Sequence, residues 1–156
     1  MWSRKLFYSA VFVCLVLLSF TISSSQAEDT TDQILTQVDD ILNANPLKAG
    51  EKIQMINIAQ DDTVSSVLIR FAEGAEVKPH FHKTHDEIVY VIKGSGQMLV
   101  NDKWADVKPG TVHFNPMNKV HSTRNTGKDP LVVLSIYTPS MKEPDRNFVE
   151  SKTEQK

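Results

Sequence analysis

The chain has 156 residues, which is enough for one domain and too few for a second full-sized hydrophobic core. Hydrophobic residues make up 40% and charged residues 23%, and this composition excludes collagen, polytopic membrane proteins and wholesale disorder. The formal net charge is -2, so the chain lacks the strongly basic character expected of a nucleic-acid-binding protein.

The first 27 residues have the pattern of a secretory signal peptide. Arg4 and Lys5 precede an apolar run over residues 6–20, and small residues flank a cleavage site after Ala27. Cleavage there would place the protein in the periplasm or outside the cell, free of the membrane. An uncleaved N-terminal membrane anchor is the alternative, because the stretch 6–22 is almost long enough to span a bilayer.

Cleavage would also remove Cys14, which is the only cysteine in the chain. The exported protein would then contain neither a disulfide nor a catalytic thiol. Its stability would have to come from packing, a metal ion or assembly.

Residues 28–50 are predicted to form a short helix and a linker. Thr30 or Thr31 is the expected N-cap, and Asn45 followed by Pro46 ends the helix. We expect the helix to pack against the body of the protein, although a helix that binds a partner would have the same pattern. Its apolar residues recur on one helical face: Ile34, Leu35, Val38, Ile41 and Leu42.

Residues 51–139 change to short β-rich runs separated by Gly-, Pro- and Asn-containing turns, which predicts an antiparallel sandwich or barrel. Pro139 ends the last strand, and the polar tail 140–156 is expected to lie over the surface or to fray. The predicted strands are 52–59, 64–72, 87–92, 97–100, 111–115, 119–125 and 131–137, with a weaker strand at 104–107.

Histidine spacing is the most informative feature of the sequence. His80 and His82 flank Phe81, so the alternation of a strand would place both imidazoles on one face. Alone, this pair is a weak signal, because two solvated surface histidines can have the same spacing.

Two longer motifs strengthen the signal. Residues 74–94 read G-x5-H-x-H-x4-E-x6-G, with Glu87 at the acidic position, and residues 110–125 read G-x5-P-x4-H-x3-N, with His121 as the histidine. Together they resemble the two motifs of the cupin family. The second motif departs from the family at Asn118, which stands where glycine is usual. Asparagine tolerates a positive φ better than most residues, so the turn can survive.

The resemblance implies an all-β fold, the cupin double-stranded β-helix or jelly-roll barrel, preceded by the short helix. It also implies that His80, His82, Glu87 and His121 bind one divalent transition metal inside the barrel. Such ligands suit Fe, Mn, Ni, Zn or Cu and leave coordination positions open for water or a substrate. A purely structural metal is the alternative. Because single-domain cupins often pair through their sheets, a homodimer is expected as well.

Three further residues are candidate catalytic groups. His85 lies in the loop between the ligands, where a solvated loop residue is the simpler interpretation. His113 lies on a predicted strand, and the sequence leaves open whether it faces the metal or the solvent. Arg70 interrupts an apolar strand: facing inward it would clamp a substrate carboxylate, but we favour an outward orientation.

The cupin fold alone does not define a function, because it hosts enzymes of several classes as well as binding proteins. The leading hypothesis is an exported metalloenzyme that acts on a small oxyanion or enol substrate, with dioxygenase- or decarboxylase-like chemistry. Sugar isomerase or lyase chemistry comes next. A non-catalytic protein that binds a small molecule or a metal, and a structural subunit, are the remaining alternatives.

Overall fold

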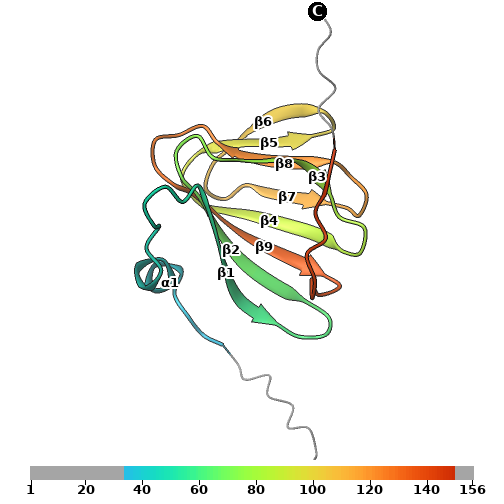
Figure 1. The fold of residues 1–156 in the computed structure, drawn as a ribbon, viewed down its shortest axis with the longest axis horizontal. Helices are drawn as coiled ribbons and strands as arrows, with labels where there is room; N and C mark the ends of the chain where they lie inside the picture. Colours follow the sequence, from blue (N-terminus) through green and yellow to red (C-terminus); the bar gives the residue numbers. More distant parts are fainter. Residues whose placement is uncertain (1–33, 150–156) are drawn as a thin grey trace, which may run out of the picture. The chain divides into compact units, whose positions relative to one another are not determined.

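The computed structural model describes residues 34–149, which form two antiparallel five-stranded sheets and one short helix (Figure 1). The predicted signal peptide, the predicted N-caps Thr30 and Thr31, and residues 150–156 lie outside the described residues. Among the residues described, no helix is both long and apolar enough to span a membrane.

The first sheet has the order β1-β2-β9-β4-β7, and the second has the order β10-β3-β8-β5-β6. From β2 onward the chain passes repeatedly between the two sheets, which is the connectivity of a jelly-roll barrel and confirms the predicted all-β fold. The strands of the first sheet are β1 (Ile53–Gln60), β2 (Ser65–Phe71), β9 (Leu131–Thr138), β4 (Asp86–Lys93) and β7 (Val112–Asn115). Those of the second are β10 (Asn147–Phe148), β3 (Glu76–Phe81), β8 (His121–Asn125), β5 (Gly96–Val100) and β6 (Lys103–Val107).

Two of these strands are absent from the strands predicted from sequence. β3 contains Pro79, which has no N–H group for a sheet ladder, and its pairing with β8 is interrupted between Val77 and His80. β10 lies in the tail that was expected to drape over the surface or fray. It pairs with β3 so that Phe148 lies opposite His80. Of the two alternatives given for the tail, fraying is therefore wrong at Asn147 and Phe148; we call residues 140–149 the C-terminal segment.

The helix α1 (Val38–Ala44) is shorter than predicted. Its N-cap is Gln37, and it ends at Asn45 as expected. The preceding apolar residues Ile34 and Leu35 are 59% and 96% exposed, so no packing extends the helix toward them. At the other end, the Arg70 guanidinium of β2 donates hydrogen bonds to the carbonyl oxygens of Leu42 and Asn45, both at 3.0 Å, and ties the helix to the first sheet.

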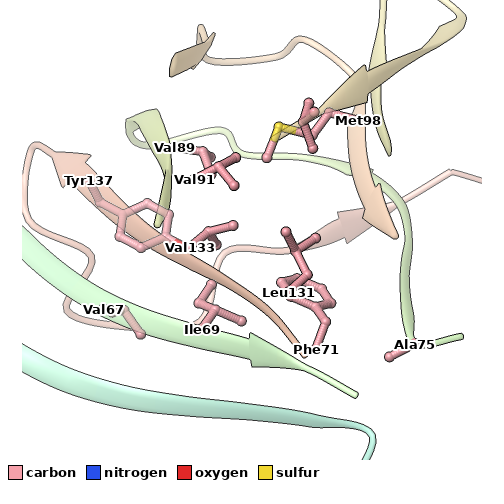
Figure 2. Close-up of a cluster of buried hydrophobic side chains, with 11 residues drawn as sticks. Val67, Ile69, Phe71, Ala75, Val89, Val91, Met98, Leu131, Val133 and Tyr137 are labelled. Atoms are coloured by element: carbon pink, nitrogen blue, oxygen red, sulfur yellow. The ribbon is translucent and has the colours of Figure 1, made fainter. Parts of the chain in front are cut away.

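The hydrophobic core fills the space between the two sheets (Figure 2). Alternate residues of the first sheet point inward, and Met98 and Val107 meet them from the second sheet. The core ends at Tyr137, whose ring lies 5.8 Å from that of His82 and 5.1 Å from that of His85. The histidine cluster thus adjoins the core inside the barrel. The inward residues of the first sheet are Val67, Ile69, Phe71, Val89, Val91, Leu131, Val133 and Tyr137.

Candidate metal centre

Four side chains from three strands and one loop converge inside the barrel. His80 is the next-to-last residue of β3 and lies directly opposite His121, the first residue of β8. His82 follows β3, and Glu87 enters from β4 in the facing sheet. All four side chains are buried, with exposed fractions between 2% and 6%. The three imidazole rings lie 4.4 to 5.1 Å apart, and their nitrogens can approach a common ion.

Backbone contacts fix how each imidazole ring is protonated. The Nδ1 atom of His80 lies 2.9 Å from the Lys78 carbonyl oxygen, and that of His121 lies 2.9 Å from the Lys119 carbonyl oxygen. The Nδ1 atom of His82 lies 2.8 Å from the carbonyl oxygen of Asp145. Because a carbonyl oxygen only accepts hydrogen bonds, each Nδ1 must carry the proton. Each neutral ring therefore has its lone pair on Nε2.

The Nε2 atoms of His82 and His121 face a carboxylate rather than a hydrogen-bond donor. Glu87 Oε2 lies 3.1 Å from His121 Nε2 and 3.9 Å from His82 Nε2. Both nitrogens are buried and have no hydrogen-bond partner among the described residues. Lone pairs that point at a buried carboxylate repel it unless a cation lies between them. The donor set therefore fits a divalent metal ion.

The same surroundings keep these ligands in the protonation states that a metal requires. Burial, with a contribution from the neighbouring His121, lowers the pKa of His80 to about 4, so its ring is neutral at pH 7. Burial alone would raise the pKa of Glu87, but a positive charge at His121 Nε2, the place that a bound metal ion would take, outweighs burial and lowers the pKa to about 2. Asn115 Nδ2 also donates a hydrogen bond of 3.0 Å to Glu87 Oε2 and orients the carboxylate.

The turn of the second motif supports the ligands of the first. Asn118 has a φ of 62°, which confirms the expected positive φ at this position. Its backbone N–H donates to the His82 carbonyl oxygen at 2.7 Å. Asparagine therefore supplies the turn that glycine usually supplies, and the turn holds the loop that carries His82.

The C-terminal segment also holds that loop, which the sequence patterns did not predict. Asp145 Oδ2 accepts hydrogen bonds from the backbone N–H groups of Lys83 and Thr84, at 2.7 and 2.8 Å, and from the Thr84 hydroxyl at 2.7 Å. These bonds outweigh the opposing effect of burial and lower the pKa of Asp145 to about 2. No motif links residues so far apart in sequence, so only the folded chain reveals this contact.

The three candidate catalytic residues occupy different surroundings. His85 is 1% exposed and packs against His82 and Tyr137, so its interpretation as a solvated loop residue is wrong. His113 lies opposite Val89, a core residue, and therefore faces the barrel interior. Arg70 holds the end of α1 and so faces away from the barrel interior, as favoured from sequence; its use as an inward substrate clamp is wrong.

Two further residues share the cavity with the metal ligands. The cavity has a volume of about 30 Å³, which is room for an ion or a water molecule but not for a larger substrate. Tyr137 lines it and keeps its proton, because burial and the Glu87 carboxylate raise its pKa. Arg146, from the C-terminal segment, also lines it.

Residues 67–137 match the family model of the cupin domain. A glucose-6-phosphate isomerase of Thermococcus onnurineus is 33% identical over 120 residues, which are 70% of this chain and 61% of the isomerase. The chain thus spans about three fifths of that relative. An uncharacterized protein of Aquifex aeolicus is 34% identical over 100 residues, which are 64% of this chain and 80% of that protein.

Solved structures show the same fold. KdgF from Halomonas sp. superposes with a TM-score of 0.55 at 25% identity, over 59% of this chain and 83% of KdgF. A predicted oxalate decarboxylase from Thermotoga maritima gives a TM-score of 0.53 at 25% identity, over 56% of this chain and 80% of the decarboxylase.

Proposed function

This chain belongs to the cupin superfamily, and from that premise we propose that it is a metal-dependent enzyme that acts on a small oxyanionic substrate. One observation carries the proposal. Three imidazoles donate Nδ1–H to backbone carbonyls, and two of them, those of His82 and His121, direct their Nε2 lone pairs toward the buried Glu87 carboxylate. His80, His82, Glu87 and His121 would hold one divalent transition metal, whose positive charge would polarise a substrate carbonyl or enolate oxygen.

The protein's own side chains supply the remaining chemistry. Tyr137 stays protonated beside Glu87 and can donate a hydrogen bond to a substrate oxygen. Burial lowers the pKa of His113, which therefore presents a neutral imidazole on the interior face of β7 and can accept a proton. Tyr137 is thus a neutral proton donor and His113 a neutral proton acceptor beside the metal site. Such a pair suits the transfer of a proton to or from the carbon next to a substrate carbonyl group.

The names of the relatives favour sugar chemistry within this class. The isomerase from Thermococcus onnurineus is named for glucose 6-phosphate, and KdgF from Dickeya dadantii, another relative of this chain, is named a pectin degradation protein. We therefore propose isomerisation or ring opening of a small anionic sugar as the reaction. Decarboxylase- or dioxygenase-like chemistry is the second candidate, because the similar protein from Thermotoga maritima is named a predicted oxalate decarboxylase.

Metal titration tests the site directly. Purified protein is stripped with a chelator and titrated with Zn²⁺ and Mn²⁺, and binding is measured by calorimetry. Wild-type protein is expected to take up one ion, and His121→Ala to bind it at least about 100-fold more weakly, because one of four ligands is lost. His113→Ala is the matched control and should bind as the wild type does. A wild-type protein that takes up no metal contradicts the proposal.

The reaction is tested on metal-loaded protein with glucose 6-phosphate and galacturonate in D2O under anaerobic conditions. Solvent deuterium entering the substrate, or a change in ring form detected by NMR, supports proton transfer. Metal-dependent O2 uptake or CO2 release with small carboxylates would instead favour the second candidate. Binding without turnover in every assay contradicts an enzymatic role.

A further inference from the structure

Only one of the three arginines in the described residues is free to bind a substrate. Arg70 is hydrogen-bonded to the end of α1, and Arg124 donates to Gln97 and stacks 3.8 Å above the Trp104 ring. Arg146 forms no ion pair among residues 34–149. Its one hydrogen bond in that range goes to the Met55 sulfur at 2.9 Å, which is a weak acceptor that an anion can replace.

Arg146 also lines both the metal cavity and a larger hollow. It lines the 30 Å³ cavity together with His80, Glu87 and His121. It lines an open hollow of about 1020 Å³ as well, and of the residues around the two spaces only Arg146 and Val77 are shared. Because the cavity is too small for a sugar, we place the body of such a substrate in the hollow, with its reacting end toward the metal ligands.

The walls of the hollow suit an anionic substrate with an apolar face. Lys78 adds a second positive charge, and Glu76, the one carboxylate in the lining, lies 4.0 Å from the Arg124 guanidinium. Phe148 is 60% exposed and lies 5.9 Å from the ring of His80, and its ring offers an apolar surface beside Arg146. Arg146 also acts electrostatically on the buried hydroxyl of Tyr137, which places its positive charge close to the cavity.

We propose that Arg146 binds the anionic group of the substrate, a carboxylate or a phosphate, at the entrance to the metal cavity and so determines substrate specificity. The proposal deepens the proposed function and rests on it. Arginine suits this role, because its planar fork binds two oxygens of a carboxylate or phosphate at once.

Matched pairs of ligands test this inference on Zn²⁺-loaded protein. Galacturonate is compared with galactose, and glucose 6-phosphate with glucose, by calorimetry or ligand-observed NMR. Arg146→Gln is expected to weaken binding of galacturonate, of glucose 6-phosphate or of both at least about 10-fold, the usual range for a lost charge-assisted hydrogen bond. Binding of the neutral sugars should stay unchanged. If only galacturonate binds more weakly to Arg146→Gln than to the wild type, Arg146 binds a carboxylate. If only glucose 6-phosphate does, Arg146 binds a phosphate.

Two further variants separate binding from structure. Arg146→Lys keeps the charge and loses the fork, so its affinity is expected to lie between those of the wild type and Arg146→Gln. Lys142→Gln removes a positive charge from the same segment at a residue that pairs with Asp62, and it should bind each ligand within about twofold of the wild type. Zn²⁺ affinity measured without sugar should be equal in all variants.

Several outcomes overturn the proposal. These are anion binding by Arg146→Gln that equals the wild type, an equal loss for neutral sugars, and a wild-type protein without preference for the anionic member of either pair. Failure of the proposed function can be told apart from failure of the Arg146 proposal, because in the first case the wild-type protein binds no Zn²⁺. In that case the same anion titrations on metal-free protein still decide the role of Arg146.

Discussion

Asp145 shows how a single side chain outside the barrel strands stabilises the ligand loop. Its carboxylate accepts three hydrogen bonds from Lys83 and Thr84, and its backbone carbonyl orients the His82 ring. The ionised form receives these bonds, and the folded protein therefore lowers the Asp145 pKa from 3.8 to about 2. A lowered pKa stabilises the folded state above pH 3.8, and this contribution disappears as the pH falls toward 2.

We expect Asp145→Asn to cost about 2 kcal/mol of unfolding free energy at pH 5, because hydrogen bonds to a charged group are lost. The difference between variant and wild type should shrink between pH 4 and pH 2. Urea unfolding of metal-free protein at several pH values measures it. Glu143→Gln, in the same segment, is the control and should have little effect at any pH. A difference for Asp145→Asn that stays constant down to pH 2 would contradict this account.

At the scale of single elements, the glycines of the first motif have separate structural roles. Gly74 has a φ of 67° and Gly94 a φ of 79°, so both occupy the left-handed region. A Cβ at Gly74 would have open space, whereas a Cβ at Gly94 would lie 2.5 Å from the Pro130 carbonyl oxygen. Glycine is therefore required at position 74 for its backbone angle alone. At position 94 it is required for its backbone angle and also because the chain after β4 passes close to Pro130, just before β9.

Alanine substitutions should separate the two effects. Gly74→Ala is expected to cost about 1–2 kcal/mol of unfolding free energy, the cost of a left-handed non-glycine residue. Gly94→Ala should cost at least about 3 kcal/mol, because the backbone must also shift to relieve the overlap. Chemical denaturation measures both values. Equal costs at the two positions would show that the contact with Pro130 has no energetic effect.

For the whole molecule, the outer face of the first sheet is unusually apolar. Ile88 pairs with Phe114, and Tyr90 pairs with Val112, so four exposed side chains form one patch on β4 and β7. Val112 is 64% exposed and Phe114 55% exposed. Contiguous apolar surface of this kind is typical of protein interfaces.

We expect two copies of the chain to associate through this patch. Light scattering after size-exclusion chromatography should give the mass of a dimer for the wild type. Phe114→Glu should give a monomer, because it would bury a charge in the interface. Leu35→Glu changes an apolar residue that is 96% exposed outside the sheets, and it should remain dimeric. A wild-type protein that is monomeric at every concentration contradicts the expectation.

The sequence predicts the barrel and the four metal-ligand candidates because both depend on local patterns. Strand alternation and motif spacing place His80 and His82 on the barrel, and asparagine chemistry explains the turn at Asn118. Pro79 obscured β3, since proline is a poor predictor of a strand. The roles of Asp145 and Arg146 depend on contacts with residues more than 60 positions away, which no local pattern records.

The match to the family model ends at residue 137, and the C-terminal segment begins at residue 140. The metal-ligand candidates thus lie within the part of the chain that cupins share, whereas the residue proposed to select the substrate lies beyond it. On this proposal a descendant of the protein would acquire a new substrate by exchanging Arg146, while Asp145, the barrel and its four ligand positions stay intact. Sequence differences that change the substrate would then be found near the carboxyl terminus.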